Sequence, residues 1–144
     1  LFNIICVIVL TLIVPTFAKV SLNIQGLQAQ LKNDFVELNF NVDSSISTLL
    51  VNGQNIAARV QKTFFLDWIY NGQGVFNPNG IFVVEQSDQR VHFYWLQNDL
   101  ANFFDIELHY IMEDGLSGVY CYAKYINNQN QNVAVGETRI VSMI

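Results

Sequence analysis

The sequence predicts an all-β fold, an antiparallel β-sandwich, from three observations. Apolar and polar side chains alternate with a period of two over most of the chain, polar turns separate the alternating segments, and no stretch of a dozen residues carries a helical stripe. Of the 144 residues, 51% are hydrophobic and 13% are charged. That balance provides the core of one domain and excludes a disordered chain.

The first segment, Leu1 to Ala18, contains no charged side chain and reads as an export signal. Its apolar stretch, Ile4 to Val14, has the length of a signal-peptide core and falls short of the roughly 20 residues that span a bilayer. We expect cleavage after Ala18, which leaves residues 19–144 as a secreted, extracellular protein with no stable membrane anchor. The alternatives are an uncleaved anchor and a buried core strand.

Cys121 would be the only cysteine of the mature chain, because Cys6 lies in the export segment. An intrachain disulfide is then excluded, so stability must come from burial and backbone pairing. We expect Cys121 to be a small buried hydrophobic residue, with an intermolecular bridge as the alternative.

The clearest strands of the first half are Phe35–Val42 and Ile46–Val51. The first is expected to bury one face, made of Val36, Leu38, Phe40 and Val42. The second runs into Asn52-Gly53, a dipeptide that accepts the positive φ angles of a tight turn, so we expect a hairpin there.

The second half contains six further predicted strands, at Phe64–Tyr70, Ile81–Glu85, Val91–Leu96, Phe104–Tyr110, Val119–Ile126 and Glu137–Ile144. The alternation is clearest in the fourth of them. One face carries Phe104, Ile106, Leu108 and Tyr110, and the other carries Asp105, Glu107 and His109. Strands with hairpin-like spacing favour an antiparallel sandwich or barrel over a fold of alternating strands and helices.

The charge pattern and the missing motifs exclude several classes of function. The formal net charge is −5 and no basic run occurs, which argues against generic binding to nucleic acid. Phosphate-binding loops, zinc-protease motifs and the nucleophile motif of serine hydrolases are not found, and no cysteine pair has metal spacing. We therefore expect no cofactor, no metal site and no nucleic-acid partner.

Two histidines and one acidic cluster are candidate catalytic groups. His92 and His109 lie on predicted strands, where a lone histidine is usually structural or solvated and only rarely a general base. Glu113-Asp114-Gly115 is expected to be an acidic turn that closes a hairpin, with a pair of catalytic carboxylates as the alternative.

Aromatic side chains suggest binding to sugars, because a flat ring covers the apolar C–H face of a pyranose. Tyr120 and Tyr122 share one face of their strand, while Cys121 and Ala123 face the other way and suit a tightly packed interior. We take Tyr120 and Tyr122 as candidate substrate-binding residues, with core packing as the alternative. The other aromatic candidates are Trp68, Tyr70, Tyr94, Trp95 and Tyr125.

Arg139 is the third candidate binding residue. It follows Glu137 and Thr138 into an apolar strand, and a guanidinium held on a rigid strand can grip a carboxylate with two parallel hydrogen bonds. The alternative is a salt bridge to Glu137, two residues away on the same face.

Two segments carry a family resemblance. Gly115–Ala123 reads GLSGVYCYA, and Gly136–Val141 reads GETRIV. Together they resemble the "G-x-S-G-x-Y-x-Y-A … GETR" region of the rhamnogalacturonate lyase family (polysaccharide lyase family 4), which acts on pectin. Phe65–Trp68 is similar to that family's aromatic "x-W-D-x-x-W" neighbourhood, although Asp and Trp stand in the reverse order.

The resemblance implies a fold and a place in a longer chain. The family has a β-super-sandwich related to galactose mutarotase, followed by two further β domains. Residues 19–144 would be the N-terminal portion of that sandwich domain. The chain starts without Met and ends inside the apolar run Arg139–Ile144, so we expect it to be truncated at both ends.

The resemblance also implies an activity, the cleavage of rhamnose–galacturonate linkages of rhamnogalacturonan I by β-elimination. The family's base and acid, a Lys and a His, lie downstream of the GETR motif, so no catalytic residue is expected in this chain and the fragment itself should be inactive. Arg139 matches an arginine thought to bind the uronate carboxylate. The alternatives are a non-catalytic secreted carbohydrate-binding β-sandwich and a secreted structural protein without a ligand.

Overall fold

The computed structural model describes residues 19–57, 64–69, 73–98, 104–127 and 137–142, and for 64–69, 73–75 and 137–142 it describes the backbone only. The export segment expected at 1–18 lies outside these ranges. The described residues form strands and turns and contain no helix, as predicted. Accordingly, none of them belongs to a helix with the length and apolar character to span a membrane.

The first half forms a five-stranded antiparallel sheet in which the strands are arranged in chain order. Its strands are β1 (Ser21–Gln25), β2 (Gln28–Lys32), β3 (Val36–Phe40), β4 (Ile46–Val51) and β5 (Gln54–Asn55). The hairpin predicted at Asn52-Gly53 is confirmed, since both residues have positive φ angles, of 50° and 75°, and join β4 to β5.

The second half forms a four-stranded antiparallel sheet of order β11-β10-β9-β8. Its strands are β8 (Gly80–Gln86), β9 (Arg90–Gln97), β10 (Phe104–Glu113) and β11 (Tyr120–Asn127). A third sheet, of order β12-β6-β7, is described by its backbone and consists of β6 (Phe64–Ile69), β7 (Gln73–Val75) and β12 (Glu137–Ser142). The predicted strands are therefore confirmed, with ends that shift by a few residues.

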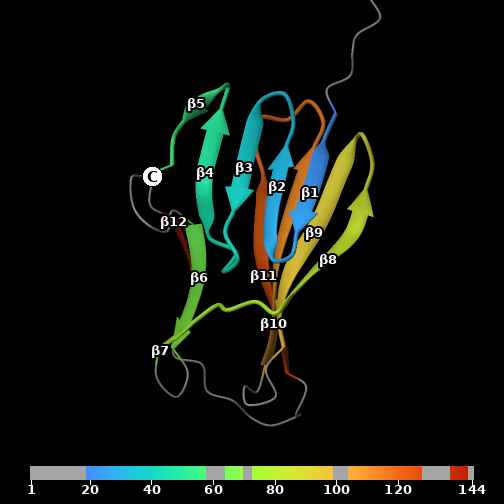
Figure 1. Cartoon of the computed structure of the whole chain (residues 1–144). Helices are drawn as coiled ribbons and strands as arrows, with labels where there is room; N and C mark the ends of the chain where they lie inside the picture. Colours follow the sequence, from blue (N-terminus) through green and yellow to red (C-terminus); the bar gives the residue numbers. More distant parts are fainter. Residues whose placement is uncertain (1–18, 58–63, 70–72, 99–103, 128–136, 143–144) are drawn as a thin grey trace, which may run out of the picture.

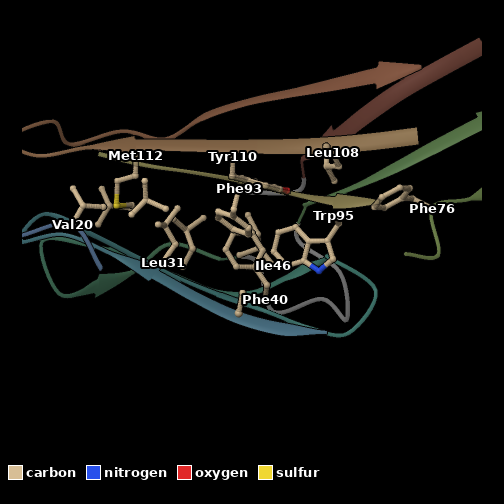
Figure 2. Close-up of a cluster of buried hydrophobic side chains, with 14 of the residues drawn as sticks. Val20, Leu31, Phe40, Ile46, Phe76, Phe93, Trp95, Leu108, Tyr110 and Met112 are labelled. Carbon is tan, nitrogen blue, oxygen red and sulfur yellow. The ribbon is translucent and has the colours of Figure 1, made fainter. Parts of the chain in front are cut away.

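The five-stranded and four-stranded sheets pack face to face as a β-sandwich, with β1–β3 in front of β9–β11 in Figure 1. Their inner faces meet in an aromatic cluster (Figure 2). The ring centroid of Phe40 lies 4.7 Å from that of Trp95 and 4.8 Å from that of Tyr110. The ring centroids of Phe93 and Trp95 are 4.9 Å apart. Such tilted and edge-on contacts add to the free energy gained by burying the rings.

The inner face predicted for Phe35–Val42 is correct for Val36, Leu38 and Phe40, which are buried, and wrong for Val42, which is 57% exposed. The strand ends before Val42 because the chain turns. Asn41 and Ser45 close that turn with a 2.8 Å backbone hydrogen bond, and Ser44 adopts a positive φ angle of 63°.

Candidate functional site

Tyr120 and Tyr122 project from β11 on the outer face of the four-stranded sheet, away from the core, as the sequence predicts. Tyr120 is 71% exposed. Tyr122 is half-buried, because one face of its ring stacks on His109 at 4.4 Å between centroids and 5° between planes. Tyr120 is thus the freer of the two as a stacking surface for a ligand.

Arg139 lies on β12, and its backbone is paired with Asp67 of β6. Its side chain lies outside the described part of the chain, as does that of Glu137, so the choice between a carboxylate clamp and a salt bridge stays a prediction. β12 belongs to a different sheet from β11. The backbone pairing therefore does not bring Arg139 into one ladder with the two tyrosines.

A row of rings crosses the outer face of the four-stranded sheet, one ring from each strand. The strand register places Phe82 beside Tyr94, Tyr94 beside His109, and His109 beside Tyr122. The neighbouring ring centroids are 5.3, 4.7 and 4.4 Å apart. This contact between side chains on paired strands fixes the orientation of His109 at the centre of the row.

His109 is 5% exposed although it lies on the face that the sequence marks as polar. Its buried ring is fully hydrogen-bonded. Nε2 lies 2.9 Å from Glu107 Oε2, and Nδ1 lies 2.9 Å from His92 Nε2. Lys124 completes the network, since its Nζ donates to the same Glu107 oxygen at 3.0 Å. His92 and His109 therefore form a hydrogen-bonded pair and are not lone residues, and the structural role expected for them stays a prediction.

The hydrogen bonds assign the tautomers of the two rings for the state in which both are neutral. The Glu107 carboxylate only accepts, so His109 donates from Nε2 and its Nδ1 accepts. His92 must then donate from Nε2, which leaves its own Nδ1 as an acceptor. Burial, and then the proximity of His109 and Arg90, lower the pKa of His92 below the ordinary 6.5 and favour this neutral state.

Glu107 holds the charged end of the network. Burial alone would raise the pKa of this carboxyl, but the hydrogen bonds from His109 and Lys124, with the charge of Lys124, outweigh burial and leave that pKa below its ordinary value. Glu107 is thus ionised at neutral pH. The sequence shows Glu107 and His109 on one face, but their link to His92 and Lys124 depends on the strand register.

A groove of about 460 Å³ opens at the end of this outer face, next to the turn between β10 and β11. We call it the Tyr120 groove, and its lining residues are Arg90, Ile111, Glu113, Leu116, Gly118, Val119 and Tyr120. The acidic turn predicted at Glu113–Gly115 is confirmed, because β10 ends at Glu113 and Gly115 has a positive φ angle of 72°. Of the lining residues, Tyr120 and Glu113 are the two that the sequence marks as candidates, Tyr120 for stacking and Glu113 as part of the acidic turn.

Asn33 fixes the wall of the Tyr120 groove from the opposite sheet. Its side-chain amide donates to the carbonyl of Glu113 at 3.1 Å and to that of Leu116 at 2.8 Å. Its amide oxygen accepts hydrogen bonds from the backbone N–H groups of Phe35 and Val36. One buried amide therefore ties the β2–β3 turn to the β10–β11 turn.

Cys121 faces the interior, as predicted, and lines an apolar cavity of about 210 Å³ with Tyr110 and residues of β3 and β4. Burial raises the pKa of the Cys121 thiol to about 12. The thiol is then protonated at neutral pH and unreactive, which supports a packing role. Trp95 is fully buried in the core, whereas the side chains of Trp68 and Tyr70 lie outside the described residues.

Comparison with known proteins gives one distant relative. No protein-family model matches the chain, and no solved structure matches it significantly. The chain is 28% identical to a rhamnogalacturonate lyase of Dickeya dadantii over 131 residues, which cover 85% of this chain and 22% of that protein. The chain is therefore distantly related to a lyase of which it spans a minor part.

Proposed function

We propose that the chain is the N-terminal part of a secreted polysaccharide lyase that cleaves rhamnogalacturonan I. The observation that carries the proposal is the 28% identity to a rhamnogalacturonate lyase over 85% of this chain. The GETR motif at Gly136–Arg139 and the all-β fold support it. Residues 1–18 would direct the protein out of the cell, and residues 19–144 would form the first part of a β-super-sandwich.

The chemistry of β-elimination explains the role proposed for Arg139. The reaction removes the hydrogen at C5 of the uronate, next to a carboxylate that already carries negative charge. A cation at that carboxylate stabilises the enediolate that develops, while a base takes the proton and an acid assists the leaving oxygen. Arg139 would supply the cation, and the base and acid would come from residues beyond Ile144.

The outer face of the four-stranded sheet would contribute to binding of the polysaccharide. Tyr120 is 71% exposed, so a sugar ring can stack on it. The Tyr122 ring would support that surface through its contact with His109. The acidic net charge of −5 slows the approach of a polyanion only weakly, because physiological salt screens charges over roughly 8 Å.

The direct test is an assay of the full-length protein that contains this chain on rhamnogalacturonan I. Lyase action creates a C4–C5 double bond beside the carboxylate, so ultraviolet absorbance from unsaturated uronate should rise with time. If no such absorbance appears and neutral polysaccharides are retained, the protein is a non-catalytic carbohydrate-binding sandwich. If no polysaccharide is retained, a structural role without a ligand is left.

Replacing Arg139 with lysine in the full-length protein should lower kcat/KM by a factor that corresponds to about 1–3 kcal/mol. Lysine keeps the charge but loses the bidentate geometry toward a carboxylate. Initial rates of unsaturated-uronate formation measure the effect. Glu137→Gln is the control. If Arg139→Lys leaves the rates unchanged while both variants lower the melting temperature equally, Arg139 belongs to a structural ion pair.

A further inference from the structure

We infer that the Tyr120 groove binds a neutral sugar ring and discriminates against a uronate. The inference rests on the proposed function, because it names the class of sugar that a pectic polysaccharide presents at this surface. It is carried by the apolar platform of the groove and by the state of its arginine.

The platform consists of exposed apolar groups. Tyr120 and Leu116 are 71% and 54% exposed, and both line the groove together with Ile111 and Val119. Aromatic and aliphatic surface of this kind covers the C–H face of a pyranose and leaves its hydroxyls at the rim. A volume of about 460 Å³ is within the range of small-molecule sites, so at least one sugar ring fits.

The charge of the groove selects against an anion. Among the residues that the structure describes, Arg90 is the only cation that lines the groove, and two carboxylates pair with its guanidinium. Nη1 lies 2.8 Å from Glu85 Oε2, and Nε lies 3.3 Å from Glu113 Oε1. His92 adds no positive charge at neutral pH, because its pKa lies below the ordinary value. A uronate would therefore meet more negative than positive charge.

Hydroxyl groups meet no such penalty. A hydroxyl donates to a carboxylate and accepts from a guanidinium, so it can join the Glu113–Arg90 pair without disturbing the balance of charge. The Arg90 and Glu113 side chains are 39% and 50% exposed, which leaves them within reach of a ligand. A neutral sugar ring therefore suits both the apolar platform and the charge of the groove, because it can stack on Tyr120 and direct its hydroxyls toward Arg90 and Glu113.

The test is an NMR titration of the full-length protein that contains this chain with three methyl glycosides, those of rhamnose, galactose and galacturonic acid. We expect saturable shifts of signals from Tyr120 and Leu116 with a neutral glycoside and at least about tenfold weaker binding of the galacturonide. Preference for rhamnose would place the polymer backbone in the groove, and preference for galactose would place a neutral side branch there. Equal or tighter binding of the galacturonide, or no binding of either neutral sugar, overturns the inference.

Variants of Tyr120 and Phe82 test whether the sugar binds in the Tyr120 groove. Tyr120→Ala should weaken neutral-sugar binding by about 2- to 12-fold, the range of one aromatic contact, and Tyr120→Phe should keep most of it. Phe82→Ala is the matched control, since Phe82 is an exposed ring on the same outer face and does not line the groove. Equal losses in Tyr120→Ala and Phe82→Ala would contradict the assignment.

Glu85 allows the effect of charge to be tested without a change in the lining of the groove, because it pairs with Arg90 but does not itself line the groove. Glu85→Gln removes one of the two carboxylates that neutralise Arg90, so binding of the galacturonide should strengthen while binding of the neutral glycoside changes little. An unchanged preference would contradict the role of this carboxylate. Unfolding curves of each variant establish that it is folded.

The sugar titration and the lyase assay can fail independently, so the failure of this inference can be distinguished from the failure of the proposed function. A full-length protein that forms unsaturated uronate, combined with a chain that binds no neutral sugar, would refute the inference alone. A chain that binds neutral sugars in a protein without lyase activity would refute the proposed activity and leave the groove in place.

Discussion

Replacing Trp95 with alanine should lower the free energy of unfolding by about 3–5 kcal/mol, the largest stability change expected in the described part of the chain. Trp95 is fully buried and contacts the rings of Phe40, Phe93 and Tyr110 (Figure 2). Its indole N–H also donates to the carbonyl of Leu27 at 3.3 Å. Alanine would leave a cavity between the two sheets and an unpaired carbonyl.

Urea unfolding followed by circular dichroism measures this effect. Trp95→Phe should cost less, because most of the ring is kept, and Phe82→Ala on the outer face should change stability by well under 1.5 kcal/mol. A loss below about 1 kcal/mol for Trp95→Ala would mean that the two sheets do not share the core described above.

Glu107→Ala should lower the free energy of unfolding at pH 7 by about 2–3 kcal/mol, because it removes a partly buried carboxylate that accepts hydrogen bonds from His109 and Lys124. His109 would keep a buried N–H without an acceptor. Lys124→Ala is the matched control. Lys124 is 55% exposed, so loss of its ion pair should cost at most about 1 kcal/mol.

The effect of Glu107 should depend on pH with a definite sign. Its pKa in the folded state lies below the ordinary 4.5, so its stabilisation is complete above pH 4.5 and disappears as the pH falls through the lower folded value. The difference between wild type and Glu107→Ala should therefore be constant from pH 7 to pH 5 and shrink in more acidic solution. A constant difference down to pH 2 would show that the carboxylate charge is not involved.

His92 should make the protein sensitive to mild acid in a separate pH range. Its pKa is lowered from 6.5, so below pH 6.5 the unfolded chain takes up the proton more readily and the folded state loses stability. His109, Arg90 and Glu85 are the charged or titratable groups that act on it. His92→Asn should flatten the decline in melting temperature between pH 6.5 and pH 5. An identical decline in both proteins would exclude His92 as its cause.

The strands could be predicted from sequence because their cause is local. In Phe104–Tyr110 each buried side chain alternates with an outward one, and the structure keeps that alternation along β10. Val42 marks the limit of this reasoning. Its apolar side chain continues the pattern, but the turn closed by Asn41 and Ser45 ends the strand first, and that turn depends on hydrogen bonds that periodicity does not report.

The candidate site was less predictable because it depends on strand register. Tyr120 could be identified from its place opposite the small side chains of β11. The His92–His109–Glu107 network could not, because its members come from two strands, and a shift of one residue in their pairing would move His92 to the other face of β9. In the sequence, Arg90 cannot be told from any other surface cation. Its role becomes visible only in the structure, where its guanidinium pairs with Glu85 and Glu113.

The order of strands has a consequence for how the chain reaches its native state. Strands β1 to β5, and strands β8 to β11, each pair with their neighbours in sequence, so each meander needs only short loops to be closed. The ladder between β6 and β12 joins residues about seventy positions apart. We expect the two meanders to form early during synthesis and the β6–β12 ladder to be the slow step, since it must wait until both meanders have left the ribosome.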